Sequence, residues 1–282
     1  MKEVLEIRIN HDFAHLLFDD CEGKNLGTSV RIVSITKEDS RYLQIPNIAK
    51  KIKRKYGRGF YFGWEIKRTY TKKELLDTNL FRVVVKTTFE PAGEECGTEY
   101  DETVACEICG ANRKQSGPLH LRKSSIPKKD IARTIAGEVI VSRAFKEACE
   151  SYSLKGLHFE QVYSRNRPID YFQLGAVSTK LVLMDKTIAG IDPFDLSESC
   201  EGEVYKCPEG HTIGLNLLSE LYVKDFRNAE VPDFFETEQK IGVKRGLLRP
   251  EALLLCTPNF RKMILNEKLK GFGFEIAHIE QG

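Results

Sequence analysis

Long apolar runs are missing from this sequence. The longest candidates, residues 181–184 and 253–256, have the length of a strand, whereas a membrane-spanning helix needs about 20 apolar residues. The first six residues, Met-Lys-Glu-Val-Leu-Glu, carry charges where a signal peptide would be apolar. We therefore expect a soluble, cytoplasmic protein that does not enter a membrane.

Two further absences narrow the possible functions. There is no strong charge imbalance, because 43 basic and 41 acidic residues leave a net charge of +2, so the chain as a whole is not a polycation. There is also no P-loop, no GxGxxG, no HExxH and no recognisable hydrolase motif. A metal-dependent enzyme is the least favoured class of function, and we expect no enzymatic activity.

The composition is that of a globular protein. Of the 282 residues, 41% are hydrophobic and 30% are charged, which supplies enough apolar material for a core. At about 150 residues a domain, the length predicts two domains. The fold class that we predict is α+β, with a β-rich N-terminal α+β domain over residues 1–100 and a second domain over residues 101–282.

The N-terminal part carries local signals for short helices and strands. Pro46 suits the first turn of a helix that Gly57 would end. Thr71 and Glu74 form a capping-box pattern at the start of a second, shorter helix. Patterns of apolar residues predict four strands, at residues 3–10, 30–35, 60–66 and 81–89.

From residue 106 onward the chain repeats itself. The residues around Phe145 recur around Phe260, and Gly156 with its following strand recurs at Gly271, so one offset of 115 residues joins both pairs without a gap. Each copy reads as a short strand, a capped helix, a glycine and a second strand. A segment of this length and order is typical of one parallel crossover.

Upstream of these blocks the offset between the copies is smaller. Asp130 matches Asp233 at an offset of 103, and Cys106 matches Cys207 at an offset of 101. The second copy therefore contains an insertion, near residues 239–249. We expect two repeated strand–helix–strand units, over about 104–165 and 205–280.

Each repeat unit begins with residues that can bind a metal ion. Cys106 and Cys109 lie two residues apart and precede a glycine, a spacing that lets two thiolates bind one tetrahedral zinc ion. In the second unit, Cys207 and His211 offer a thiolate and an imidazole. The four residues predict a closed, structural zinc site that bridges the two units. Cys200 is an alternative fourth ligand.

The remaining cysteines are less informative. Cys21, Cys149 and Cys256 are predicted to lie in the core, and Cys96 is a weak candidate in a loop. A redox role for Cys106 and Cys109 is disfavoured, because the two residues between them include neither a small residue nor a proline.

We call the two metal-binding turns, residues 106–110 and 207–211, the knuckles. At these knuckles the chain resembles the bacterial double-CXXCG-motif proteins, which have two cysteine knuckles in one chain. Each knuckle of that family is followed by a short strand, a helix and a glycine-aromatic strand, as in residues 106–162 and 207–276 here. The resemblance covers roughly residues 100–280. It departs at the second knuckle, where Gly210 and His211 stand in place of cysteine and glycine. Some members are encoded beside secreted toxins and resemble immunity proteins. The resemblance implies a binding protein that neutralises a cognate toxin.

A basic segment at residues 50–73 supports an alternative function. Ten lysines and arginines lie there against Glu65 alone, with aromatic residues among them. Cations that neutralise phosphates, next to rings that stack on bases, are typical of single-strand binders, so a zinc-ribbon nucleic-acid-binding protein is the alternative. The same segment would suit an acidic protein partner. Its rings and guanidinium groups predict four partner-binding anchors: Arg54, Arg58, Tyr61 and Trp64.

Overall fold

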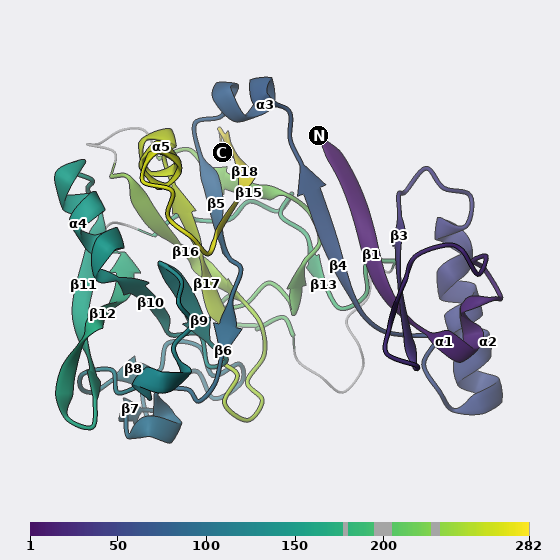
Figure 1. Ribbon diagram of the computed structural model, residues 1–282, viewed down its shortest axis with the longest axis horizontal. Coiled ribbons are helices and arrows are strands. Elements are labelled where there is room, and N and C mark those ends of the chain that lie inside the picture. The colour runs from purple at the N-terminus through teal and green to yellow at the C-terminus, as the bar shows by residue number, and fades with distance from the viewer. Residues whose placement is uncertain (177–179, 195–204, 227–231, 282) are drawn as a thin grey trace. The chain divides into compact units, whose positions relative to one another are not determined.

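The computed structural model describes residues 1–176, 180–194, 205–226 and 232–281. They form two compact units. Unit 1 consists of Met1–Asp77 with residues 192–194, and unit 2 consists of Thr78–Ile191 with the described residues from 205 onward. The chain is mixed α+β and richer in strand than in helix (Figure 1), which confirms the predicted fold class.

Unit 1 is one antiparallel sheet with short helices. The strand order is β2-β3-β1-β4. The strands are β1 (Lys2–Asn10), β2 (Lys24–Leu26), β3 (Val30–Ile35) and β4 (Tyr61–Thr69), and the helices are α1 (His11–Ala14), the 3-10 turn η1 (Tyr42–Gln44), α2 (Ile45–Tyr56) and α3 (Lys72–Asp77).

Helix α2 covers one face of this sheet (Figure 1). Ile45 and Ile52 point into a core that includes Ile7 and Ile9 of β1. Pro46 lies in the first turn and Gly57 ends the helix in the left-handed conformation, with φ of 66°, as predicted. The other side of α2 is left to solvent, and it carries the cations of the segment 50–55.

The capping box that begins α3 is also confirmed. The Thr71 backbone N–H donates to Glu74 Oε2 over 2.7 Å, and the Glu74 N–H donates back to Thr71 Oγ1 over 3.2 Å. This reciprocal pair satisfies two of the N–H groups that a helix start leaves without intrahelical partners.

Unit 2 contains two five-stranded sheets, ordered β11-β12-β10-β9-β6 and β15-β18-β5-β17-β16. Its helices are α4 (Arg143–Ser151), α5 (Pro258–Asn266) and the 3-10 turns η2 (Glu94–Cys96) and η3 (Lys123–Ser125). Its strands are β5 (Phe81–Val85), β6 (Thr88–Phe89), β7 (Tyr100–Asp101), β8 (Lys114–Gln115), β9 (Ile131–Thr134), β10 (Val139–Ser142), β11 (Leu157–Ser164), β12 (Arg167–Ala176), β13 (Ala189–Gly190), β14 (Asn216–Leu217), β15 (Leu221–Lys224), β16 (Phe234–Ile241), β17 (Glu251–Cys256) and β18 (Phe272–Glu280).

The division between the units falls at Asp77 and Thr78, whereas the sequence analysis placed a boundary near residue 100. The difference has a clear cause in strand pairing. β5 lies between β17 and β18 and pairs antiparallel with both. β6 pairs parallel with β9 of the other sheet. Residues 81–89 therefore belong to unit 2, although they precede the knuckles in sequence.

The two segments that resemble each other in sequence also have the same local topology. β10, α4 and β11 follow one another in the first, and β17, α5 and β18 in the second. In each, the two strands flank a third strand that runs antiparallel to both. That middle strand is β12, directly after β11, in the first sheet, but β5, from much earlier in the chain, in the second.

Two aspartates join these segments through matching hydrogen bonds. Asp130 accepts from the Ser142 hydroxyl over 2.9 Å and from the Lys270 backbone N–H over 2.7 Å. In the same way, Asp233 accepts from the Thr257 hydroxyl over 2.7 Å and from the Lys155 backbone N–H over 3.0 Å. Each carboxylate thus binds the residue before its own helix and the backbone of the other segment.

The glycine after each helix approaches the other segment's backbone. Gly156 has φ of 87°, and a Cβ there would lie 2.7 Å from the Phe234 carbonyl oxygen. Gly271 has φ of 104°, and a Cβ there would lie 2.4 Å from the Ile131 carbonyl oxygen. Both the backbone conformation and the close approach require glycine at these two positions.

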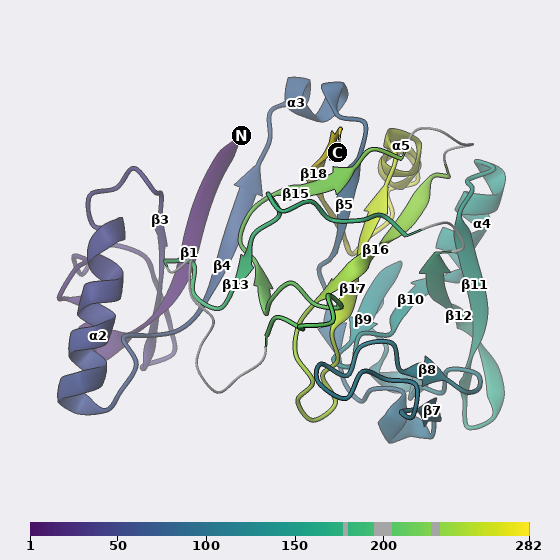
Figure 2. The same ribbon diagram turned by 180° about the vertical axis from the view of Figure 1, so that it is seen from behind.

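Aromatic rings fill the space between α4 and α5, which lie next to each other in both views (Figures 1 and 2). The Phe145 ring of α4 stacks on Phe272 at 5.5 Å and meets the Phe260 ring of α5 edge-on at 5.9 Å. Phe145 and Phe260 are fully buried. The rings therefore pack the two segments together beside their exchanged hydrogen bonds.

We expect Gly271→Ala to destabilise unit 2. The left-handed backbone costs about 1–2 kcal/mol for an L side chain, and the contact with the Ile131 carbonyl adds a packing cost of about 1–3 kcal/mol. Urea unfolding should show a loss of about 2 kcal/mol or more. Gly175→Ala is the matched control, because that strand glycine has nothing within 4 Å of its Cβ position. Equal stability of the two variants would contradict the prediction.

Candidate metal centre

The four residues that the spacing singled out lie together in unit 2. One ligand atom each from Cys106, Cys109, Cys207 and His211 lies within 4.8 Å of the others. Cys109 and Cys207 are buried, and Cys106 and His211 are partly buried. Two segments about 100 residues apart in sequence thus meet at a single cluster of soft and borderline ligands, which is the donor set that Zn²⁺ prefers.

Each half of the cluster is a tight turn. In the first, Gly110 donates its backbone N–H to the Cys106 carbonyl over 2.8 Å, and the Cys106 N–H donates to the Ala111 carbonyl over 2.8 Å. In the second, Gly210 donates to the Cys207 carbonyl over 2.9 Å. Gly110 and Gly210 have φ of 69° and 78°, which favours glycine at both.

The second turn closes one residue earlier than the first. Its glycine comes three residues after the cysteine instead of four, so the next ligand position is occupied by His211. The Cys207 N–H is held by Thr212, through the carbonyl at 3.2 Å and the hydroxyl at 2.9 Å. An imidazole is longer than a thiol side chain, and it reaches the cluster from this later position.

The separations match those of ligands around one ion. Cys106 Sγ lies 3.8 Å from Cys207 Sγ, and His211 Nδ1 lies 3.7 Å from Cys207 Sγ and 3.9 Å from Cys109 Sγ. Zinc bonds of about 2.3 Å to sulfur and about 2.0–2.1 Å to nitrogen put two sulfurs about 3.8 Å apart, and sulfur and nitrogen about 3.6 Å apart, on a tetrahedron. A disulfide needs about 2.05 Å between its sulfurs, and the three cysteines of the cluster are free.

The environments of the two cysteines of the first turn differ. The Cys109 backbone N–H donates to the Cys106 sulfur and lowers the pKa of that thiol, whereas burial raises the pKa of Cys109. The first turn therefore favours a thiolate at Cys106, and a bound cation would supply the stabilisation that a thiolate at Cys109 requires.

Lysines border the cluster. Lys240 donates its backbone N–H to the His211 carbonyl over 2.8 Å, and its ammonium donates to Asn112 Oδ1 over 3.0 Å. The aliphatic part of Lys244 lies against Gly110. Three thiolates and a neutral imidazole around Zn²⁺ would carry a net charge of about −1, which the nearby lysine charges offset.

The other cysteines are placed as follows. Cys149 and Cys256 are buried, as expected. Cys21 is exposed, so the prediction that it lies in the core was wrong: it follows α1 in a loop rather than on a strand. Cys96 is partly buried, and it is not one of the ligands of the cluster. The alternative fourth ligand, Cys200, lies outside the described residues.

The four predicted partner-binding residues do not share one surface. Arg54 and Arg58 are exposed, and Arg58 pairs with Asp12 over 2.9 Å. Tyr61 and Trp64 instead pack against the core of unit 1, and the Tyr61 hydroxyl donates to Asp192 Oδ2 over 2.5 Å. Treating these two rings as exposed anchors was therefore wrong. A bulge at Arg8 and Ile9 sets which β4 residues face inward.

The exposed ring of this strand is one that the sequence analysis did not select. Phe62 is 59% exposed, and Tyr56, at the end of α2, is 50% exposed. Successive side chains of a strand point to opposite faces of the sheet, but this alternation does not show which face the rest of the protein covers. With Tyr61, Phe62 and Trp64 all aromatic, the pattern held no signal that separated the inward rings from the outward one.

The basic segment 50–73 also divides between two surfaces. Lys67 pairs with Glu6 and Arg68 pairs with Glu3, both across β1 and β4. The cations of α2 remain exposed and make no ion pair with any of the described residues. We call this set the α2 basic face; it consists of Lys50, Lys51, Lys53, Arg54 and Lys55.

Neither a search of protein-family models nor a search of curated proteins finds a match. Within the described part of the chain, no helix has the length and hydrophobicity that crossing a membrane requires.

The purified protein should contain about one zinc per chain. The four ligands form one cluster, and a structural zinc site contributes about 10 kcal/mol or more to folding. Elemental analysis under reducing conditions measures the metal, and thermal melts before and after chelation measure its effect on stability. Cys109→Ser should lose both the metal and several degrees of melting temperature, whereas the exposed Cys21→Ser should lose neither. A metal-free preparation with an unchanged melt would contradict this.

His211 should contribute one of the four bonds. His211→Ala should therefore release zinc to a chelator at least about tenfold faster, because a three-ligand site binds less tightly. His158→Ala is the matched control, since His158 is exposed and pairs only with Glu160 in the described structure. If the two variants release zinc at the same rate while Cys200→Ala releases it faster, the fourth ligand is Cys200.

Proposed function

We propose that this protein is a non-enzymatic, zinc-containing binding protein of the immunity type, which binds and neutralises a bacterial toxin in the cytoplasm. The observation that carries the first half of the proposal is the closed Cys₃His cluster. The second half is supported by the resemblance of residues 100–280 to double-CXXCG-motif proteins, with the second knuckle altered to Cys207 and His211.

The ligand set favours structure over catalysis. A catalytic zinc keeps one coordination position open for water or substrate, while a structural zinc is saturated by four protein ligands. Three cysteines and one histidine fill a tetrahedron, and Cys109 and Cys207 are buried. Zinc bound there would have no position at which to activate a water molecule.

The same site would fasten two related segments. We take the segments 104–165 and 205–280 to be copies of one unit, and the paired roles of Asp130 and Asp233 support this, as do those of Gly156 and Gly271. One turn from each copy would face a bound ion. A metal shared in this way would hold the copies at their knuckle ends, while the aspartates and the phenylalanines hold them at their helices.

The α2 basic face is the surface that best fits an acidic partner. Its five cations lie on successive turns of α2 and are exposed, and the helix contains no acidic residue. Tyr56 and Phe62 add exposed rings in the same unit. Complementary charge increases the rate of encounter, and exposed rings supply the contact area that anchors a complex. A toxin with an acidic surface is the partner that this chemistry describes.

Nucleic acid is the second candidate partner. The same five cations would neutralise phosphates, and Tyr56 and Phe62 would stack on unpaired bases. The two partners differ in salt dependence. Nucleic-acid binding loses affinity steeply as salt rises because counterions are released, whereas a protein complex with buried anchors loses mainly its rate of association.

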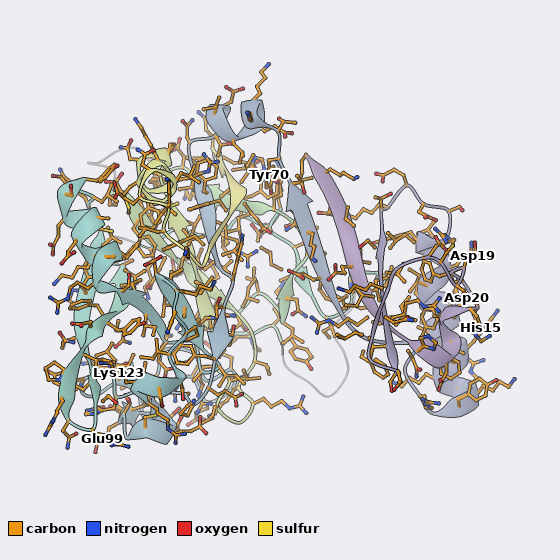
Figure 3. The ribbon with its side chains drawn as sticks, in the orientation of Figure 1. His15, Asp19, Asp20, Tyr70, Glu99 and Lys123 are labelled. Atoms are coloured by element: carbon orange, nitrogen blue, oxygen red, sulfur yellow. The ribbon has the colours of Figure 1, made fainter. Side chains whose placement is uncertain are left out.

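Charge reversal on α2 tests the proposed function. We expect Lys51→Glu with Lys55→Glu to weaken binding of the toxin encoded by the neighbouring gene at least about tenfold, because two attractive charges become repulsive. Surface plasmon resonance measures the affinity, and co-expression with the toxin measures protection. The control is Lys123→Glu with Lys128→Glu. Both control residues are exposed in unit 2, and Lys123 is labelled in Figure 3.

The outcomes separate the candidates. Protection that survives the α2 changes, in variants that melt like the wild type, removes the α2 basic face as the toxin surface. Binding to a single-stranded oligonucleotide that is abolished by the same changes and falls steeply with salt would support the nucleic-acid function instead.

A further inference from the structure

Unit 2 has a half-open cavity of about 370 Å³ whose wall includes the first metal-binding turn. Its walls come from β5, β12, β16 and β17, and from the turn between β9 and β10. Gly110 and Asn112, next to Cys109, close one side. The volume is within the range of about 300–1,000 Å³ that small-molecule sites occupy. None of the motifs in the sequence pointed to it.

The lining has more cationic than anionic side chains. The carboxylates are Glu138, Glu236 and Glu251. The cations are Arg82, Arg113, Arg133, Lys180, Lys240 and Arg249. The salt bridges of Arg82, Arg113 and Arg249 are made with carboxylates outside the lining, namely Glu275, Glu94 and Glu102. The cations therefore line the cavity, whereas these partner carboxylates do not.

The carboxylates of the lining already have partners. Glu138 accepts from the hydroxyls of Tyr100 and Thr134, and Glu251 pairs with Arg133. Glu236 accepts from a backbone N–H at Ala176 over 3.3 Å. These carboxylates already accept hydrogen bonds from the protein itself. They are therefore less available to bind a positively charged ligand.

Two donors of the lining lack a hydrogen-bond partner in the described structure, and a third has only a neutral one. The Nε–H groups of Arg133 and Arg249 are buried without a hydrogen-bond acceptor in the described structure. The Lys240 ammonium has a neutral amide, Asn112, as its hydrogen-bond partner, and its charge is opposed by that of Lys180. A buried donor without an acceptor is unfavourable, so an acceptor placed in the cavity would be favoured.

We infer that this cavity is a binding site for a small organic anion, a carboxylate or phosphate ester, held by Lys180, Lys240 and the guanidinium groups of Arg133 and Arg249. Guanidinium groups bind these planar or tetrahedral anions through paired N–H donors. Leu174, Val139 and Leu254 supply apolar wall for the rest of such a molecule. The inference concerns unit 2 alone and does not depend on the proposed partner of α2.

Binding should also strengthen the metal centre. Lys240 touches the first turn through Asn112 and the second through the His211 carbonyl. The first contact is made by the ammonium and the second by the Lys240 backbone N–H, so an anion bound to the ammonium would restrain the residue that lies between the two turns. Zinc release to a chelator should therefore be slower when the anion is bound. By thermodynamic linkage, removal of zinc should lower the affinity for the anion.

The test measures binding to the zinc-loaded, full-length protein by isothermal titration calorimetry, at constant ionic strength. The probes are inorganic phosphate, citrate and adenosine monophosphate, with the diamine putrescine as the probe of opposite charge. We expect at least one anion to bind with a stoichiometry of one, and putrescine not to bind. Phosphate and citrate distinguish a phosphate site from a carboxylate site.

Two substitutions place the anion in the cavity. Lys180→Gln should weaken its binding at least tenfold without loss of stability, because Lys180 is exposed and pairs with none of the described carboxylates. Arg249→Gln should weaken it further. Lys123→Gln and Lys128→Gln remove the same charge elsewhere on unit 2 and should change nothing. If no anion binds, if putrescine binds instead, or if Lys180→Gln binds as the wild type does, the inference is wrong.

Discussion

The pairing of β5 with β17 and β18 is the constraint on which unit 2 depends. A strand from residues 81–85 occupies the centre of a sheet whose other strands all come from residues 221–280. The chain then continues into β6, which joins the second sheet beside β9. One short stretch of backbone therefore belongs to both sheets, forms a wall of the cavity and brings the first knuckle to the side of the second.

This arrangement explains why local patterns predicted the elements better than their assembly. Pro46, Gly57 and the pair Thr71 and Glu74 act within one or two helical turns, so their effects could be predicted from neighbouring residues. Ser142 likewise caps α4 by accepting from the Phe145 N–H over 3.2 Å. The apolar residues of β5 predict a strand, but they contain no information about partner residues that lie 171–195 positions later, from Val83 with Leu254 to Phe81 with Ile276. The predicted domain boundary near residue 100 was misplaced because this long-range pairing could not be predicted from the local pattern.

The candidate site shows the same division between local and distant information. Cys106 and Cys109 are marked by their own spacing, and Cys207 and His211 were found because a repeat carried the pattern forward. The cavity had no such marker. Its six arginines and lysines come from separate stretches of the chain, and in the sequence each looks like an ordinary surface cation. The exposure of Trp64 was mispredicted for another reason. Aromatic residues lie on both faces of β4, so the pattern did not show which face is covered.

The exchanged hydrogen bonds of Asp130 and Asp233 have a consequence for the history of this chain. Each aspartate binds a hydroxyl of its own segment and a backbone N–H of the other, which is the pattern that a two-fold axis creates between identical subunits. If the segments arose by duplication, their shared contacts descend from the interface of a homodimer. In that case the middle strand of each sheet would be the element in which the two copies differ, because it is β12 in the first sheet and β5 in the second.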